Sequence, residues 1–230
     1  MSGRAQKFQS GVAGGAGALR LYDYWSSSCA YRVRIALALK GLSYERVVVK
    51  RLDGIEEPAY RVVNAQGFVP TLELGGARLV QSTAILEFME ESWPEPPLLP
   101  ATAVARARVR ALAALVACDI QPLNNQRVQD ALLAEYGFDR ATLQRWYARW
   151  IGEGFAALER MLADNPATGT FCHGEAPGMA DVCLIPQVFN ARRWHCDLTA
   201  YPLIRRIDAA CRALPAFADA APERQPDCPE

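Results

Sequence analysis

The sequence has no excess of charge of either sign, because Lys and Arg total 25 and Asp and Glu also total 25. No global field therefore draws the chain to nucleic acid or to a membrane surface, and any preference for anions must come from local placement of arginine. No apolar run approaches about 20 residues, which excludes a transmembrane helix. The apolar fraction of 51% and the charged fraction of 22% are those of an ordinary globular protein.

The seven cysteines lack the spacing of a disulfide framework or of a zinc site. Scattered free thiols are typical of a reducing compartment, so we expect a cytoplasmic protein. Cysteine and histidine are neighbours at 172–173 and at 195–196, but neither pair has a usual zinc-ligand spacing, and we expect no metal. A dithiol redox motif is also missing, because Arg32 stands three positions after Cys29 in place of a second cysteine.

Changes in composition divide the chain into segments. Residues 1–18 are rich in Gly, Ala and Ser and contain no acid; we expect a flexible extension, with a weak transit peptide as the alternative. Strand and helix patterns alternate over 19–93, and a proline-rich linker at 94–101 marks a domain boundary. Only helical periodicity follows over 102–222, and 223–230 is a tail that we expect on the surface.

The first domain begins with a βαβ pattern. Apolar and β-branched residues predict strands at 19–24 and 44–49, and helical periodicity predicts a helix at 29–40 that is ended by Gly41. The two strands should be parallel, because a helical crossover joins them. A short, poorly formed helix is expected at 56–63.

A hairpin and a helix complete this domain. Gly75-Gly76 should connect a strand at 71–74 to a strand at 78–80. A helix should then begin with Ser82 or Thr83 as its N-cap. Its apolar face should consist of Ala84, Ile85, Phe88 and Met89.

The second domain shows helical patterns throughout. They cover 104–128, 140–162, 181–193 and 201–214, and no strand pattern accompanies them. Gly178 and Asp181 resemble a capping box with glycine in the cap position. We therefore expect an all-helical second domain.

The point where the first strand meets the first helix carries three hydroxyls and a thiol, on Ser26, Ser27, Ser28 and Cys29. Backbone N–H groups at a helix start have no intrahelical partner, and the helix dipole places its positive end there. Such a corner favours an anion and would stabilise a thiolate, which could belong to Cys29 or to a bound thiol.

Ordered motifs in both domains give the chain a family resemblance. The motifs are Ser-Ser-Cys-x-x-Arg-Val-Arg-Ile-Ala-Leu from Ser27, Val-Pro-Thr-Leu from Val69, Gln-Ser-x-Ala-Ile from Gln81, Ile-Gln-Pro-Leu-Asn-Asn from Ile120, Met-Ala-Asp-Val-Cys-Leu-Ile-Pro-Gln-Val from Met179 and Gln-Pro-Asp from Gln225. In this order they resemble the zeta-class glutathione transferases over about residues 19–228. The resemblance implies an α/β thioredoxin-like N-terminal domain followed by an all-α C-terminal domain, which is the glutathione transferase fold. It also implies glutathione as cofactor, a small dicarboxylate substrate and a homodimer.

The resemblance assigns the glutathione site in the first domain. It implies a cis bond before Pro70, so that the backbone of Val69 would pair with the cysteinyl part of glutathione, as an added strand pairs with a sheet edge. Gln81 and Ser82, at a helix start, would hold the γ-glutamyl carboxylate. A plain N-cap is the alternative role for Ser82, and an ordinary turn residue for Gln81.

Ser27 is the residue that the resemblance assigns to the glutathione sulfur. Its hydroxyl would hydrogen-bond the sulfur and favour the thiolate over the thiol. Ser28 and Cys29 would line the same pocket; their alternative roles are an N-cap and a small packing residue. The expected catalytic set is Ser27, Ser28 and Cys29.

The helical domain would contribute Gln121, Asn125 and Arg127 to the glutathione site. Arg193 would meet the carboxylates of the substrate, because a forked guanidinium binds them better than an ammonium does. Arg32, close to the sulfur, is a further candidate for both cofactor and substrate.

Other residues are expected to have no part in the chemistry. A surface ion pair or a solvated helix face is the expected role of Arg34 and Arg192, and neither His173 nor His195 is expected to be catalytic. The segment 50–64 is shorter than in the family, and a glutamine that the family uses on glutathione has no clear counterpart.

The activity implied by the resemblance is glutathione-dependent cis–trans isomerisation of maleylacetoacetate to fumarylacetoacetate, in tyrosine and phenylalanine catabolism. Reversible thiolate addition makes the C=C bond temporarily single, so no general base is required. One alternative is maleylpyruvate isomerase, and another is a transferase or dehalogenase that acts on small α-halo acids. A non-catalytic binding module is an alternative of a different class; it should have lost Ser27 or the Gln81-Ser82 pair.

Overall fold

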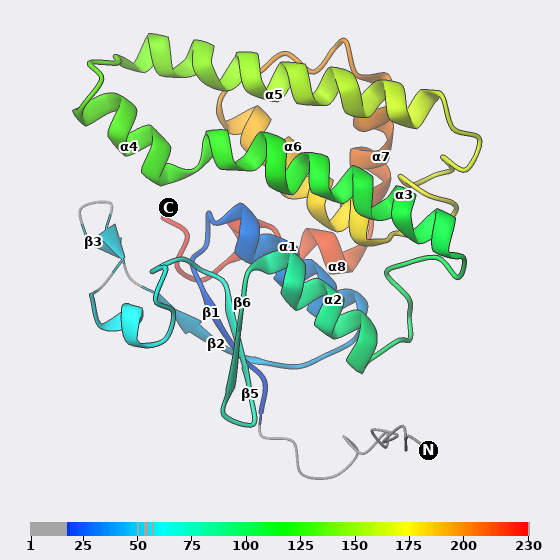
Figure 1. Ribbon diagram of the computed structural model, residues 1–230, viewed down its shortest axis with the longest axis horizontal. Coiled ribbons are helices and arrows are strands. Elements are labelled where there is room, and N and C mark those ends of the chain that lie inside the picture. The colour runs from blue at the N-terminus through cyan, green and yellow to red at the C-terminus, as the bar shows by residue number, and fades with distance from the viewer. Residues whose placement is uncertain (1–17, 50, 53–54, 57, 230) are drawn as a thin grey trace, which may run out of the picture.

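A four-stranded mixed sheet organises the first part of the chain (Figure 1). The computed structural model describes residues 18–49, 51–52, 55–56 and 58–229. The sheet has the spatial order β2-β1-β5-β6, and its strands are β1 (Arg20–Asp23), β2 (Glu45–Val48), β5 (Thr71–Leu74) and β6 (Ala77–Val80). The flexible extension predicted at the N-terminus lies, up to residue 17, outside the described residues.

The predicted βαβ unit is confirmed. β1 and β2 are parallel, with Leu21 opposite Arg46, and α1 (Ser28–Leu39) connects them. Almost every side of α1 is buried, because it packs against α2 of its own domain and against the helical domain. Lys40 is the C-cap, and Gly41 follows with φ 64°, the left-handed conformation that glycine adopts at little cost.

Short elements fill the connection between β2 and β5. β3 (Arg51–Leu52) and β4 (Ile55–Glu56) form a small antiparallel pair apart from the main sheet. The 3-10 helix η1 (Pro58–Val62) follows and agrees with the poorly formed helix expected at 56–63. The β3–β4 pair was not expected, because two-residue strands are too short to produce a periodic signal.

The predicted hairpin is also confirmed. β5 and β6 are antiparallel, and Leu74 lies opposite Ala77 at the turn. Gly75 and Gly76 have φ values of 56° and 83°, and positive φ at both positions is what a tight two-residue hairpin turn requires.

The start of α2 (Ser82–Ser92) differs from the prediction. The N-cap is Gln81, and Ser82 is already the first helical residue, because β6 ends at Val80 and one residue alone turns the chain. Leu86 is buried on α2 although it was not expected on the apolar face, whereas Ala84, which was expected there, is exposed.

The linker after α2 is fixed by a buried ion pair. Lys40 Nζ lies 3.2 Å from a carboxylate oxygen of Glu90, and both side chains are almost fully buried. Glu90 also accepts hydrogen bonds from the backbone N–H groups of Leu98 and Leu99, at 2.8 and 3.2 Å. Lys40 donates to the carbonyl of Trp93, immediately before the linker, and to that of Pro96 within it. The linker is therefore anchored to the first domain at both of its ends.

The described chain from 102 to 229 contains helices and no strand, as the sequence predicts. The α-helices are α3 (Ala103–Ala114), α4 (Gln126–Ala134), α5 (Arg140–Ala163), α6 (Met179–Arg193), α7 (Pro202–Arg212) and α8 (Pro215–Ala218). Figure 1 shows this helical layer lying across the first domain.

The single helix predicted over 104–128 is wrong. After α3 the chain forms a π-helix, η2 (Leu115–Ile120), and a 3-10 turn, η3 (Gln121–Asn124), before α4 begins. Pro122 has no N–H to continue the helical pattern, and Asn125 caps a new helix by accepting from the N–H of Arg127 at 3.1 Å.

Helix α6 connects the two domains through a common core. Its predicted capping box is present, because Asp181 accepts from the N–H of Gly178 at 2.9 Å. Burial raises the pKa of the Asp181 carboxyl. α6 packs against both α1 and α3, and one apolar cluster continues across both domains.

The end of the chain returns to the first domain. After α8, η4 (Pro222–Arg224) leads to Gln225, which is 9% exposed. Asp227 then forms an ion pair with Arg46 of β2 at 2.7 Å. Most of the described tail residues are exposed or half-buried, so the tail lies on the surface, but Asp227 ties it to the first domain. Figure 1 shows the C-terminal end beside β1 and α1.

All seven cysteines are free, as predicted. Burial raises the pKa of the Cys183 thiol to about 11, and it also raises the pKa of Cys172 and Cys211. These thiols are therefore packing residues. No helix in the described part of the chain combines the length and apolarity needed to cross a bilayer.

Candidate active site

A cavity of about 690 Å³ lies between the two domains. Its walls come from the β1–α1 turn, the segment before β5, the start of α2, the η2–α4 region, the first turns of α5 and the end of α6. The structure brings eleven of the twelve predicted site residues to this cavity: Ser27, Ser28, Cys29, Val69, Pro70, Gln81, Ser82, Gln121, Asn125, Arg127 and Arg193. Arg32 is the exception.

Ser27 is the N-cap of α1. Its Oγ accepts a hydrogen bond from the N–H of Ala30 at 3.2 Å, and its own N–H donates to the carbonyl of Tyr24 at 3.0 Å. Because Oγ is the acceptor in the cap, the hydroxyl proton remains available to a ligand. The alternative of an N-cap role for Ser28 is wrong, since Ser28 is the first helical residue.

The first turn of α1 presents free backbone donors to the cavity. Among the described residues, the N–H groups of Ser28 and Cys29 have no backbone or side-chain acceptor. Cys29 is partly exposed and lines the cavity, whereas Ser28 is 9% exposed. This helix start therefore favours an anion.

The peptide bond between Val69 and Pro70 is cis, as the resemblance implies. Neither the N–H nor the C=O of Val69 pairs with another residue that the structure describes. The preceding carbonyl, of Phe68, is satisfied by Asn64 Nδ2 at 2.6 Å and by the hydroxyl of Tyr60 at 3.2 Å. Val69 thus offers an unpaired backbone N–H and C=O beside the cavity.

Gln81 has a backbone conformation that non-glycine residues rarely adopt, with φ 69°. Such a conformation costs on the order of 1–3 kcal/mol and is common at ligand sites. The side chain is exposed, and its Nε2 donates to Gln66 Oε1 at 2.7 Å. Gln66 also lines the cavity, so two glutamines meet beside the start of α2.

Arg32 does not reach the cavity surface, contrary to the prediction. Its side chain is 1% exposed, and Nη1 donates to Ser82 Oγ at 3.2 Å. The Nε and Nη2 atoms are buried without a hydrogen-bond partner among the described residues. α1 packs against α6, and the buried charge of Arg32 lies behind the helix starts and not at the cavity surface.

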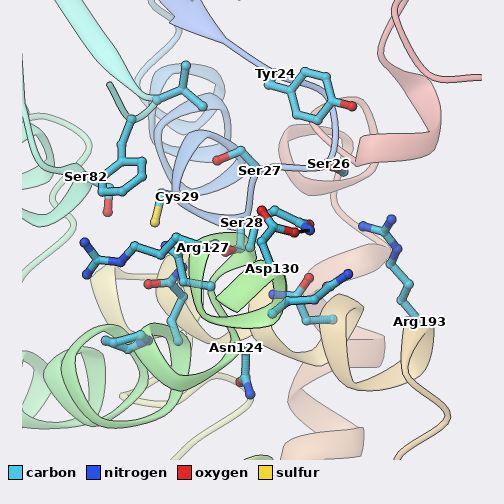
Figure 2. A pocket seen from close by; sticks show the side chains of 18 of the residues that line it. Tyr24, Ser26, Ser27, Ser28, Cys29, Ser82, Asn124, Arg127, Asp130 and Arg193 are labelled. Atoms are coloured by element: carbon cyan, nitrogen blue, oxygen red, sulfur yellow. Dashed lines mark hydrogen bonds between the residues drawn. The ribbon is translucent and has the colours of Figure 1, made fainter. Parts of the chain in front are cut away.

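The helical wall carries Arg127 and Arg193 on opposite sides of the Ser27–Cys29 group (Figure 2). The Arg127 guanidinium lies 5.1 Å from the ring centroid of Phe68, which comes from the other domain. The Arg193 guanidinium lies 5.6 Å from the ring centroid of Trp25 and is exposed. No described acidic group pairs with Arg193, so it is available to an anion.

The two arginines expected to be uninvolved differ in their surroundings. Arg192 is exposed and forms a forked ion pair, as predicted, but its partner Asp208 is buried. Arg34 is instead 1% exposed and pairs with the buried Asp23 at 2.7 Å, which corrects its expected place on a surface.

Sequence reasoning missed several residues of the cavity wall. They are Tyr24, Gln66, Asp130, Arg140, Tyr147 and His195. Asp130 accepts from Gln126 Nε2 at 2.7 Å, one turn away on α4. Spacing on a helix could have paired these two, but nothing in the sequence places α4 over the cavity. Burial raises the pKa of Tyr147, so this hydroxyl keeps its proton.

Local charge at the cavity differs from the neutral balance of the chain. Three arginines and one aspartate line it: Arg127, Arg140, Arg193 and Asp130. This excess of positive charge, together with the two helix starts, suits a ligand with several carboxylates.

Comparison with known proteins agrees with this geometry. A family model described as "Glutathione S-transferase, N-terminal domain" matches residues 26–92, and one described as "Glutathione S-transferase, C-terminal domain" matches 140–223. A protein of Rhizobium meliloti named maleylacetoacetate isomerase is 50% identical over 205 residues, which cover 89% of this chain and 96% of that protein.

Two solved structures are similar over nearly the whole fold. One is a holo structure of maleylpyruvate isomerase, described as a bacterial glutathione S-transferase in the zeta class; it has a TM-score of 0.89 and 47% identity and covers 91% of this chain and 100% of its own. The other is maleylacetoacetate isomerase from Methylobacterium extorquens AM1 with bound malonate and GSH. It has a TM-score of 0.88 and 41% identity and covers 92% of this chain and 100% of its own.

Proposed function

The chain belongs to the glutathione S-transferase family, in its zeta class, and from this membership we propose that it is a glutathione-dependent cis–trans isomerase with maleylacetoacetate as its substrate. The observation that carries the proposal is the convergence of two helix starts and the unpaired Arg193 on one cavity. A thiolate cofactor and a dicarboxylate substrate need these features together.

The residues of the first domain fit glutathione. The free N–H groups at the start of α2 and the hydroxyl of Ser82 would hold its γ-glutamyl carboxylate, beside Gln81. The unpaired backbone of Val69 would pair with its cysteinyl residue. Gln121, Asn125 and Arg127 would close the site from the helical domain.

Ser27 would set the charge state of the cofactor's sulfur. When bound, glutathione supplies a thiolate, whose reversible addition to the cis double bond allows rotation about that bond. The Ser27 hydroxyl accepts from the N–H of Ala30, which polarises its O–H as a donor toward the sulfur. The free N–H groups of Ser28 and Cys29 add to the stabilisation of negative charge there.

Arg193 would hold a substrate carboxylate. Its guanidinium has no described acidic partner and lies over the ring of Trp25, on the wall across from Arg127. A forked donor in this place orients the substrate and meets negative charge that develops during the reaction. No proton is gained or lost overall, which agrees with a site without a buried histidine.

The choice of maleylacetoacetate rests on the relative that is 50% identical to this chain. Maleylpyruvate is shorter by one methylene, and one methylene changes binding by only about 1–3 kcal/mol, so both substrates could react. Seven free cysteines support a cytoplasmic location, and a homodimer stays a prediction that analytical ultracentrifugation would check.

The test is a pair of absorbance assays, one with maleylacetoacetate and one with maleylpyruvate, each with and without glutathione. We expect turnover of both only with glutathione, and a higher kcat/KM for maleylacetoacetate. Activity without glutathione would refute the mechanism. A higher kcat/KM for maleylpyruvate would keep the mechanism and correct the substrate.

A further inference from the structure

The C-terminal tail contacts the turn that carries Ser27. The N–H of Trp25 donates to a carboxylate oxygen of Asp227 at 3.1 Å, across 202 residues of sequence. Trp25 is one of the two central residues of the turn between β1 and α1, and that turn is closed by the bond from Ser27 N–H to the carbonyl of Tyr24. The tail therefore holds the turn from outside the cavity.

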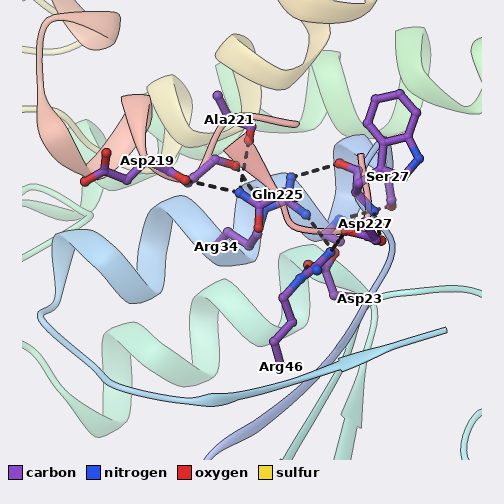
Figure 3. A network of polar contacts seen from close by, with 11 residues as sticks. Asp23, Ser27, Arg34, Arg46, Asp219, Ala221, Gln225 and Asp227 are labelled. Atoms are coloured by element: carbon purple, nitrogen blue, oxygen red, sulfur yellow. Dashed lines mark hydrogen bonds and ion pairs between the residues drawn. The ribbon is translucent and has the colours of Figure 1, made fainter. Parts of the chain in front are cut away.

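The same turn is held from below by a buried arginine. Arg34 Nη2 donates to the carbonyl of Trp25 at 3.1 Å, and its Nε donates to the carbonyl of Ala220 at 2.9 Å. Both backbone groups of Trp25 are thus fixed, the N–H by Asp227 and the C=O by Arg34. Figure 3 shows Arg34, Arg46 and Asp23 beside Asp227 of the tail.

Charge in this network is balanced only when the tail is in place. Asp23, which is fully buried, pairs with Arg34 at 2.7 Å and with Arg46 at 2.5 Å. Asp227 supplies the second negative charge, 2.7 Å from Arg46. Two arginines therefore meet two aspartates, and without the tail Arg46 and Arg34 would share one carboxylate.

The side chain of Trp25 links the turn to Arg193, the residue proposed to hold the substrate. Its indole ring lies beneath the Arg193 guanidinium, with 5.6 Å between Cζ and the ring centroid. No other described ring or carboxylate is paired with Arg193, so the Trp25 ring is its described electrostatic support. A shift of the turn would move this ring and, with it, Arg193.

We propose that Asp227 is a positioning residue, which fixes Trp25 and through its ring sets Arg193 for a dicarboxylate. The inference rests on the proposed role of Arg193 as the substrate anchor. The tail then does more than stabilise the fold, because it determines the geometry of the substrate half of the site. The glutathione half includes Ser27 on the same turn, but Ser27 is also held by its own cap on α1. No described hydrogen bond joins the tail to α2 or Val69, so glutathione binding should change less than dicarboxylate binding.

The experiment measures binding without turnover, so it stays informative if the isomerase assays fail. Malonate, a simple dicarboxylate, is titrated into the glutathione-saturated protein by calorimetry, and glutathione is titrated alone. The variants are Asp227→Ala, Asp227→Asn and Trp25→Leu. Glu223→Gln is the matched control, because Glu223 is an exposed acid on the same tail with no described ion pair. Thermal unfolding shows that each variant is folded.

Asp227→Ala should weaken malonate binding about tenfold while glutathione binding changes by less than about twofold. Asp227→Asn keeps an oxygen that can accept from Trp25 N–H, so it should restore malonate binding to within about threefold of the parent chain. Trp25→Leu should weaken malonate binding about fivefold, since it removes the ring under Arg193. Glu223→Gln should bind both as the parent chain does.

Unchanged malonate affinity in folded Asp227→Ala would overturn the proposal, because the tail would then be a structural strap only. The proposal would also be overturned if Asp227→Ala and Asp227→Asn each lost as much glutathione affinity as malonate affinity. If Asp227→Ala does not fold, Trp25→Leu decides, since parent-like malonate binding in that variant would remove the link between the turn and Arg193.

Discussion

Arg32 Nη1 donates a hydrogen bond to Ser82 Oγ at 3.2 Å, and this buried contact joins the starts of α1 and α2, the two helices that border the cavity. The guanidinium has no described acidic partner, and its Nε and Nη2 are unpaired. A buried cation without a counterion is costly for stability, and its place behind two anion-favouring helix starts indicates a role in ligand affinity.

Arg32→Met should therefore weaken glutathione binding without lowering the stability of the fold. Loss of the unpaired buried charge should leave the free energy of unfolding equal to, or about 1 kcal/mol above, that of the parent chain. Glutathione should bind about tenfold more weakly, since positive potential behind both helix starts is lost. Urea denaturation and glutathione titration measure the two effects. Arg34→Met is the matched control; it removes one of the two arginines paired with the buried Asp23 and the donor to the carbonyls of Trp25 and Ala220, and it should lose about 3–5 kcal/mol. Destabilisation of Arg32→Met to a similar extent would contradict this view.

Arg193→Lys should raise KM for the dicarboxylate about tenfold with a smaller change in kcat, because an ammonium cannot form the forked contact. Steady-state kinetics at saturating glutathione measures it. Arg192→Lys changes the neighbouring residue, whose guanidinium is occupied by Asp208, and should leave KM unaltered. Equal effects of the two variants would exclude Arg193 as the specific anchor.

Glu90→Ala should loosen the linker between the domains. It leaves Lys40 buried without its carboxylate and frees the N–H groups of Leu98 and Leu99. A loss of about 3–5 kcal/mol in unfolding free energy is expected from breaking a buried pair. Chemical denaturation would show it, and Glu91→Ala, at an exposed neighbour, is the control. A loss below about 1 kcal/mol would mean that the pair does not anchor the linker.

His173 should make stability depend on pH. Burial, with the nearby Arg108 charge, lowers the pKa of His173 below its ordinary value of 6.5, and Arg108 Nη1 lies 3.1 Å from Nδ1. The unfolded chain then binds a proton more readily than the folded one. The stability that the neutral His173 contributes is fully present above pH 6.5, the unfolded value, and is lost as pH falls below it and through the lower folded-state pKa. His173→Asn keeps an acceptor for Arg108, so its melting temperature should fall less between about pH 7 and about pH 5 than that of the parent chain. An equal fall in both would contradict the assignment.

Local signals made the first domain predictable. Gly41 and the Gly75-Gly76 pair stand where positive φ is needed, and Asp181 caps α6 three residues after Gly178. Each of these depends on neighbours within a few residues, so the sequence is sufficient to recognise them. The ordered motifs then brought eleven of the twelve expected site residues to one cavity.

The features that could not be predicted from the sequence depend on packing between distant parts of the chain. Arg32 is polar and belongs to the motif that begins at Ser27, yet it is buried where α1 packs against α6, which lies about 150 residues later in the chain. Asp227 belongs to a proline-rich tail of the kind usually found on the surface, yet its partners are Arg46 and Trp25. The break before α4 follows from Pro122 and Asn125. The hydrophobic periodicity, however, does not indicate which side of α4 faces the cavity.

The central claim is that the Ser27 hydroxyl stabilises the thiolate of bound glutathione. The decisive variant is Ser27→Gly, because glycine at an N-cap costs only a few tenths of a kcal/mol whereas alanine costs about 1 kcal/mol, so helix α1 is preserved. The measurement is the ultraviolet absorbance of the thiolate in the glutathione complex as a function of pH, with isomerase kcat from the same preparation.

We expect Ser27→Gly to raise the apparent pKa of bound glutathione by about 1–2 units and to lower kcat about ten- to a hundredfold at neutral pH. Ser26→Ala, one position outside the cap, should change the pKa by less than about 0.5 unit. An unchanged thiolate titration together with full activity in Ser27→Gly would contradict the central claim.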